Sequence, residues 1–262
     1  MKLSRIPKRL TALLCAVTIM LLLTACRYET KTPAAAPTAS GVTSSAVTDP
    51  TVTKPNDPEE IPSEEEAFSR YKASVQAENE DSAVAAAVNG ESISTSLIDQ
   101  QKAAENYASI AYLHAYEQEG MSTEWEQQRV QLQQTLSKTR QEYLDETIRI
   151  VVLEQEAKKQ GYVLTEDERA EIERDVRSTT ERALTLTTDD DAVNRIAAKL
   201  MANIVEAYGS LDQYVEERTK VLAAMRPAQK LRQAYEAEHP EEGAFDAYVD
   251  ELVAAADIQY FD

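Results

Sequence analysis

Apolar residues recur with the period of an α-helix through most of the chain beyond residue 95, and no other feature constrains the fold as strongly. Each such helix must bury its apolar face against a neighbour, and about 180 residues are enough for one domain with its own core. Glycine is scarce, with six residues in 262, so few positions interrupt the pattern. The sequence therefore predicts a mostly α fold. The cleanest apolar stripe comprises Val193, Ile196, Leu200, Ile204 and Tyr208.

Capping residues, glycines and one proline mark the ends of the expected helices. Thr165 with Glu168, and Ser210 with Gln213, have the spacing of a capping box, which starts a helix. Pro227 should kink or break the helix that follows Ser210, because proline lacks a backbone donor and clashes with the preceding turn. The expected helices cover residues 97–120, 123–160, 165–184, 193–209 and 244–256. A further helix is expected to start at Ser210, and Leu231 and Tyr235 continue its apolar side beyond Pro227.

Two segments have the pattern of β-strands. Residues 83–94 (AVAAAVNGESIS) contain two short apolar runs around Asn89 and Gly90, a pair that favours a tight hairpin turn. Residues 257–261 (DIQYF) alternate apolar and polar side chains and predict a strand near the C-terminus. We expect a small β element that joins the N-terminal hairpin to this C-terminal strand.

The N-terminus has the layout of a secretory signal. Four basic residues between positions 2 and 9 precede an apolar run over residues 10–23, which is short for a membrane span. The run ends in Leu-Thr-Ala-Cys at residues 23–26, which resembles the lipobox of bacterial lipoproteins. We expect residues 1–25 to be a signal peptide and Cys26 to carry the lipid that anchors the chain in a bilayer. The alternative is an ordinary signal peptide with a chance cysteine.

The segment from residue 26 to residue 80 is expected to be a flexible linker. It is rich in Thr, Ala, Pro and Ser and contains six prolines up to residue 62, so it has little apolar surface to bury. Its last part, residues 59–80, is acidic and predicts at most a frayed helix. The folded domain is expected over residues 81–262.

The formal net charge of −19 restricts the kinds of partner. A nucleic acid would be repelled by such a field, so we expect no nucleic-acid partner. A basic unfolded polypeptide is compatible with it, although acidity also serves solubility.

Tyrosine is unusually frequent, with twelve residues against three Phe and one Trp. Its ring is apolar and its hydroxyl is polar, a combination suited to a wet surface that holds varied peptides. The alternative is that these rings lie at the boundary of helix packing. The candidate client-binding residues are Tyr107, Tyr112, Tyr116, Tyr208, Tyr214 and Tyr235.

Residue patterns for catalysis or metal binding are weak. His114 is expected to be a packed or half-exposed helix residue, and His239 a residue at a helix end. The acidic run 189–191 lacks the alternating ligands and the glycine of a calcium loop, and acids at a helix start are favourable without a metal. We therefore expect no catalytic residue, no metal and no cofactor.

Four segments in a fixed order resemble the chaperone domain of the SurA and PrsA extracytoplasmic foldases. The resemblance extends over about residues 83–262, and a lipidated anchor is most similar to PrsA. It implies a helical cradle that holds unfolded or newly secreted polypeptide. The segments are VNGESIS (88–94), QEAKKQGYVLTEDE (155–168), YGSLDQYVEERTKVLAAMRPAQKL (208–231) and FDAYVDELVAAADIQYFD (245–262).

The chain departs from that family in one respect. Those foldases usually carry a parvulin prolyl isomerase domain before the final helix and strand, whereas only a short segment separates Leu231 from Gly243 here. We therefore expect a chaperone without isomerase chemistry and without ATP, on the extracytoplasmic face of the membrane. Two copies pairing through their long helices is a further expectation. The alternatives are an isomerase with an unrecognised site and a scaffold or assembly factor for one dedicated partner.

Overall fold

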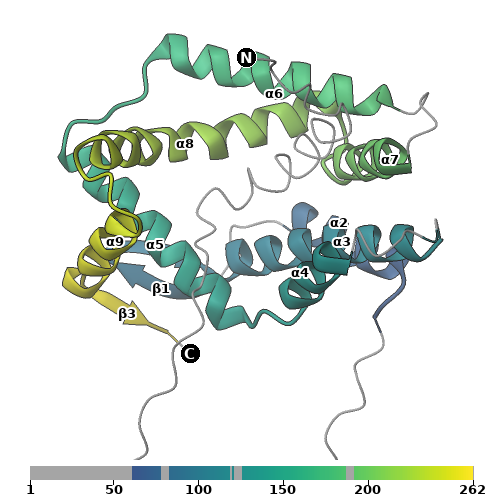
Figure 1. The fold of residues 1–262 in the computed structure, drawn as a ribbon, viewed down its shortest axis with the longest axis horizontal. Coiled ribbons are helices and arrows are strands. Elements are labelled where there is room, and N and C mark those ends of the chain that lie inside the picture. The colour runs from purple at the N-terminus through teal and green to yellow at the C-terminus, as the bar shows by residue number, and fades with distance from the viewer. Residues whose placement is uncertain (1–60, 78–82, 119, 121–125, 187–191, 262) are drawn as a thin grey trace, which may run out of the picture.

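The computed structural model describes residues 61–77, 83–118, 120, 126–186 and 192–261 (Figure 1). The expected signal peptide, Cys26 and the acidic run 189–191 lie outside these residues. The described part is mostly helical with one small sheet, as the sequence predicts. Its elements are α2 (Glu64–Gln76), β1 (Val84–Val88), β2 (Glu91–Ser94), α3 (Thr95–Gln118), α4 (Glu126–Leu136), α5 (Arg140–Lys159), α6 (Glu166–Leu184), α7 (Ala192–Ala207), α8 (Leu211–Glu238), α9 (Ala244–Ala255) and β3 (Ile258–Tyr260).

The sheet joins the two ends of the domain. Its strand order is β2-β1-β3, and both neighbours of β1 are antiparallel to it. Asn89 and Gly90 have φ angles of 51° and 86°, as the tight hairpin turn requires. The backbone N–H of Asn89 donates to the carbonyl of Asp257 at 2.8 Å, so the turn itself contacts the C-terminal strand. The predicted hairpin, strand and closing β element are confirmed.

Helix α5 carries the sheet. Val88 and Ile93 are buried against an apolar stripe of α5 that includes Ile148 and Val152. The side-chain amide of Gln155 donates to the carbonyl of Val88 at 3.0 Å. The same helix also contacts α3, α8 and α9, so it connects most parts of the structure.

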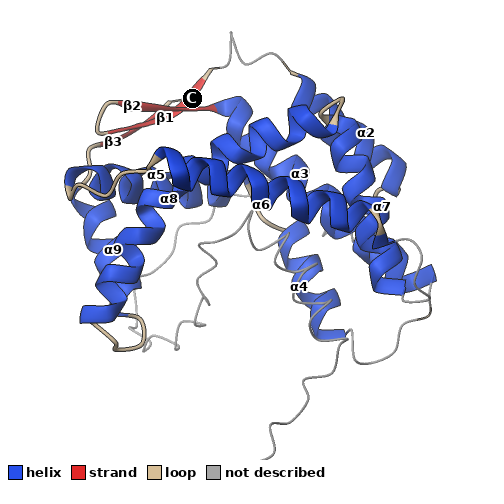
Figure 2. Ribbon diagram, turned by 90° about the horizontal axis from the view of Figure 1, so that it is seen from above, coloured by secondary structure: helices blue, strands red, loops and turns tan. Residues whose placement is uncertain are grey.

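Most of the remaining helices form two groups, which Figure 1 shows one above the other: α6 and α8 above, and α2, α3 and α4 below. Helix α6 packs along α8, while α2 and α4 pack against α3. Helix α7 contacts both groups, since it touches α2, α3, α6 and α8. Figure 2 shows the sheet and α9 together at one end and α2 and α7 at the other.

Helix α2 belongs to the helical body. Ser63 caps its first turn, and Tyr71 and Ala67 are buried against α3 and α7. Residues 64–76, which the sequence analysis assigned to the linker as at most a frayed helix, therefore form a packed helix. Only two residues of α2 are buried and many of the others are acidic, so its apolar stripe is too weak to predict a packed helix from the sequence.

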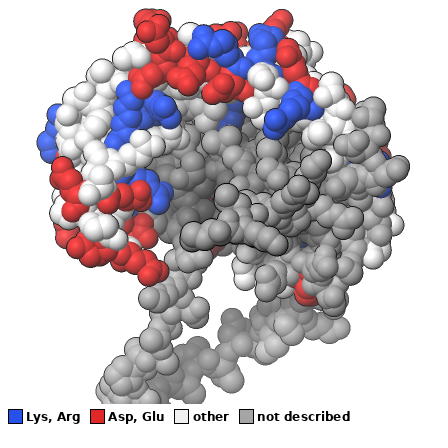
Figure 3. Space-filling model, turned by 45° about the horizontal axis from the view of Figure 1, so that its top comes forward, with Lys and Arg blue, Asp and Glu red and all other residues white. Residues whose placement is uncertain are grey.

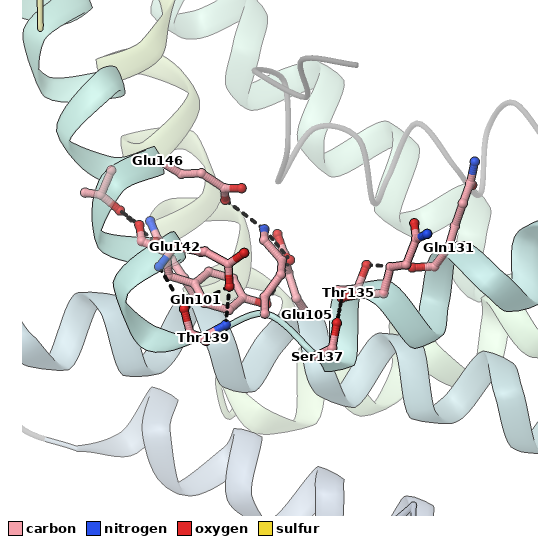
Figure 4. Close-up of polar contacts among 12 residues, drawn as sticks. Gln101, Glu105, Gln131, Thr135, Ser137, Thr139, Glu142 and Glu146 are labelled. Carbon is pink, nitrogen blue, oxygen red and sulfur yellow. Dashed lines mark hydrogen bonds and ion pairs between the residues drawn. The ribbon is translucent and has the colours of Figure 1, made fainter. Parts of the chain in front are cut away.

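The single helix expected over residues 123–160 is wrong. Helix α4 ends at Leu136, and α5 begins after Thr139, whose hydroxyl accepts from the backbone N–H of Glu142 at 3.3 Å. The Glu142 carboxylate accepts from the backbone N–H of Thr139 at 2.6 Å, which completes a capping box (Figure 4). The Thr-x-x-Glu signal was present in the sequence, and an unbroken apolar pattern hid it.

Pro227 does not break its helix. Helix α8 continues from Leu211 to Glu238 with Pro227 buried inside it. A proline in a helix interior removes one backbone hydrogen bond and crowds the preceding turn. Packing of α8 against both α5 and α6 compensates for that local cost. Of the two outcomes expected at Pro227, a kink or a break, the break does not occur.

Removing the cap at the start of α5 should destabilise the fold. We expect Thr139→Ala to lower the free energy of unfolding by about 1 kcal/mol, because the backbone N–H of Glu142 at the helix start loses its acceptor. Urea unfolding followed by circular dichroism measures the change. Thr139→Ser keeps the hydroxyl and should remain close to the wild type, and equal losses in both variants would contradict the capping role.

Candidate functional site

A hollow between the two groups of helices is here called the tyrosine cleft. Its volume is about 400 Å³, within the range of small-ligand sites. Helices α3, α5, α7 and α8 supply most of its walls, with Tyr71 of α2 and part of β2 completing them. Its lining includes Tyr71, Glu91, Leu97, Tyr107, Tyr112, Thr147, Val151, Glu154, Met201, Tyr208, Tyr214, Glu217, Arg218, Val221 and Met225.

Four of the six candidate tyrosines meet at this cleft. Tyr107 and Tyr112 come from α3, while Tyr208 and Tyr214 lie on either side of the turn between α7 and α8. A fifth ring, Tyr71 of α2, was missed by the sequence analysis because that helix was assigned to the linker.

The other two candidates lie outside the cleft lining. Tyr116 packs on Tyr112, with ring centroids 5.9 Å apart. Tyr235 stacks on Tyr248 of α9 at 4.5 Å and belongs to the apolar cluster of α5, α8 and α9. The structure thus brings together four of the predicted rings and separates Tyr116 and Tyr235 from them.

The tyrosines of the cleft are largely packed into the core. Tyr107 is 1% exposed, stacks on Tyr71 at 5.5 Å and accepts a hydrogen bond from the Asn203 side-chain amide at 2.6 Å. Burial raises the pKa of Tyr107 to about 12. Tyr208 and Tyr214 meet edge to face at 5.4 Å. These rings therefore shape the cleft more than they cover its open surface.

Leu97 and Val221 supply the exposed apolar surface of the cleft. Leu97 of α3 is 40% exposed and Val221 of α8 is 48% exposed, and both belong to the lining. Large apolar side chains that remain in contact with water on a concave surface are typical of a binding site. The tyrosine frequency did not point to either residue.

Glu154 places a carboxyl group in this apolar lining. Burial raises its pKa to about 7, Lys158 one turn further along α5 lowers it, and Glu91 of β2 raises it. A carboxyl group with such a pKa changes its charge near neutral pH. Sequence analysis did not single out Glu154.

Arg218 is the cation of the cleft lining. It is half-buried on α8, and it also lines a smaller adjoining cavity of about 240 Å³ between α6, α7 and α8. Desolvation lowers the pKa of its guanidinium, and the nearby Tyr214, Tyr208 and Tyr71 act in the opposite direction. Sequence analysis missed Arg218, because its position is defined only by the packing of α8.

The two histidines have structural surroundings. The Nε2 of His114 lies 3.1 Å from the carbonyl oxygen of Pro62, to which it donates in the corresponding tautomer. His239 caps the C-terminus of α8, and its ring centroid lies 4.4 Å from that of Tyr235. Over the described residues, no group of three His, Cys, Asp or Glu side chains is placed to hold a metal ion.

Acidic and basic side chains are interspersed on the face shown in Figure 3. Lys230 of α8 lies 2.6 Å from Glu168 at the start of α6, and Arg177 of α6 lies 2.8 Å from Asp212 of α8. These pairs connect the two upper helices across their exposed sides. None of the helices that the structure describes combines the length and the hydropathy of a membrane span.

Comparison of the chain with known protein families, with curated proteins and with solved structures gave no match.

Replacing Glu154 by glutamine should change how stability depends on pH. The carboxyl group has a raised pKa in the folded chain, so its neutral form is the one compatible with burial. The protonated carboxyl group contributes to the stability of the fold. This contribution is fully present below about pH 4.5 and is lost as the pH rises through about 7, where the buried group becomes charged. We therefore expect Glu154→Gln to be more stable than the wild type at pH 8.5. Its free energy of unfolding should be higher by on the order of 1 kcal/mol, after allowance for screening by solvent.

The difference between the two proteins should shrink steadily as the pH falls toward 5. Urea unfolding at several pH values measures it. A difference of the same size at every pH would contradict a buried carboxyl group that titrates near neutral pH.

Proposed function

We propose that this protein binds unfolded or newly secreted polypeptides in the tyrosine cleft and keeps them from aggregating, without ATP and without catalysis. One observation carries the proposal: a concave site of about 400 Å³ keeps Leu97 and Val221 in contact with water. Burial of apolar surface is non-directional, so such a site accepts varied sequences. Each client side chain buried there contributes on the order of 1–2 kcal/mol, which gives transient binding.

The walls of the cleft suit a holding role. They come from helices of both groups, and α7 and α5 connect the groups at opposite ends. Small shifts between the groups would change the width of the cleft while each apolar cluster stays intact. Met201 and Met225 in the lining add flexible apolar side chains that adapt to different partners.

We also propose the SurA/PrsA-like assignment on the order of the elements. A hairpin opens the domain, helices follow, and a last helix precedes a strand that returns to the hairpin. This order is what the resemblance of the four sequence segments implies. The segment between α8 and α9 is short, consistent with a chaperone domain without an inserted isomerase domain.

The location follows from the N-terminal sequence. The lipobox-like residues 23–26 support lipidation of Cys26, so the chain would be anchored at the extracytoplasmic face of the membrane. Clients emerging from the membrane would then be close to the cleft.

A refolding assay tests the activity. The purified full-length chain is added to an unfolded protein whose folding has a slow, proline-limited phase, and rate and yield are recorded together. We expect a higher yield and an unchanged slow phase. A faster slow phase at substoichiometric amounts would instead indicate an isomerase, and capture of a single exported partner with no effect on yield would indicate a dedicated scaffold.

A matched pair of exposed valines tests where clients bind. Val221 lies in the cleft, whereas Val163, which is 63% exposed, lies in the turn after α5 and outside the cleft lining. We expect Val221→Asn to require about fivefold more chaperone for the same protection, because about 1 kcal/mol of apolar contact is lost. Val163→Asn should behave as the wild type, and equal effects of the two variants would place client binding elsewhere.

A further inference from the structure

The guanidinium of Arg218 faces the tyrosine cleft without a counter-ion. Among the described residues, no carboxylate lies within ion-pair distance of it. Its acidic neighbour Glu217 is engaged elsewhere, with a carboxylate oxygen 2.7 Å from the ammonium of Lys220. Arg218 also lines the smaller cavity next to the cleft, so its charge lies at the junction of two hollows.

Two partly buried lysines of the structure have acidic partners, whereas Arg226 of the adjoining cavity donates to the side-chain oxygen of Gln229 at 3.5 Å. Lys138 lies 3.4 Å from Glu105, and Lys230 lies 2.6 Å from Glu168. A partly buried charge without a partner costs free energy, because lost hydration is not replaced. Arg218 is therefore placed where an anionic ligand would supply the missing partner.

Tyrosine hydroxyls complete the surroundings of this cation. Tyr71, Tyr208 and Tyr214 line the same cleft and lie close enough to influence the pKa of Arg218. Burial raises the pKa of each of these tyrosines, so each keeps its proton at neutral pH. The Tyr71 hydroxyl is already hydrogen-bonded to Tyr208, so the guanidinium supplies most of the donors available to a carboxylate and the remaining protonated hydroxyls add to them.

We propose that Arg218 binds the C-terminal carboxylate of a client polypeptide, whose last apolar residues fill the tyrosine cleft. This inference rests on the proposed function and adds to it a preference for chain ends. The cleft would then recognise one feature that every unfolded polypeptide carries, whatever its sequence.

The size and charge of the cleft favour a chain end over an internal acidic residue. A volume of about 400 Å³ is that of a small-ligand site, and a chain end needs only one way in. An internal Asp or Glu brings chain on both sides, which must enter and leave the same hollow. Glu91, Glu154 and Glu217 in the lining also disfavour a ligand with further negative charges.

Two peptides of one apolar sequence test the inference. One ends in a free carboxylate and the other in an amide, and both carry a fluorophore at a blocked N-terminus. We expect the free acid to bind the full-length chain about tenfold more tightly, as measured by fluorescence anisotropy, because charge-assisted hydrogen bonds form only with the carboxylate. This comparison uses the wild type and does not depend on any variant folding.

Substitutions on α8 locate the effect. Arg218→Gln should bind both peptides equally, with the affinity of the wild type for the amide, and Arg218→Lys should keep part of the preference. Arg232→Gln makes the same substitution on the same helix outside the cleft lining, and its partner Glu236 also lies outside it, so this variant should keep the full tenfold preference. Thermal unfolding of each variant checks that it is folded.

The outcomes separate the inference from the proposed function. Equal binding of both peptides to the wild type would overturn the carboxylate site and leave polypeptide binding intact. An amidated peptide with one internal Asp that binds as tightly as the free acid would overturn the preference for chain ends. If neither peptide binds, both proposals fail, and Arg218-dependent binding of hexadecanoate in their place would assign the cleft to a fatty acid.

Discussion

Burial of helix α5 on two sides is the constraint on which the rest of the structure depends. Ile148 and Val152 face the sheet, while Leu153 and Ala157 belong to the cluster formed with α8 and α9. One helix therefore carries the sheet and holds the upper helices in place. Because α3 and α8 both pack against α5, their facing sides remain apart, and the tyrosine cleft lies between them. The cleft is thus a consequence of the core and needs no separate scaffold.

The pairing of β3 with β1 couples the folding of the two ends of the domain. The C-terminal strand adds to a hairpin that begins more than a hundred residues earlier, and the Asn89 side chain accepts from the backbone N–H of Asp257 at 2.9 Å. Loss of either end would expose the apolar side of β1, whose Ala86 and Val88 are fully buried. A closed body of this kind holds its cleft in shape while clients enter and leave.

The cleft combines packing that stabilises the fold with charges that do not. Its tyrosines stack on one another and contribute to the core. Glu154 and Arg218, by contrast, lose hydration on burial, and that cost appears in their shifted pKa values. Residues that oppose folding in this way are common at binding sites, where a ligand supplies the missing interactions. This contrast separates the residues that shape the cleft from those available to a ligand.

The amino-acid sequence by itself determined the local features of the fold. The Asn89-Gly90 turn and the caps at Thr165 and Ser210 depend on a few neighbouring backbone groups, so their residues suffice to predict them. Tertiary structure decided the rest, because burial and charge pairing depend on residues far apart in the chain. Packing against α5 and α6 keeps α8 continuous through Pro227, and contact with α3 turns α2 into part of the core. Only the assembled helices place Arg218 beside three tyrosines and away from any described carboxylate partner. The absence of a partner depends on residues of several helices, so no local sequence pattern predicts it.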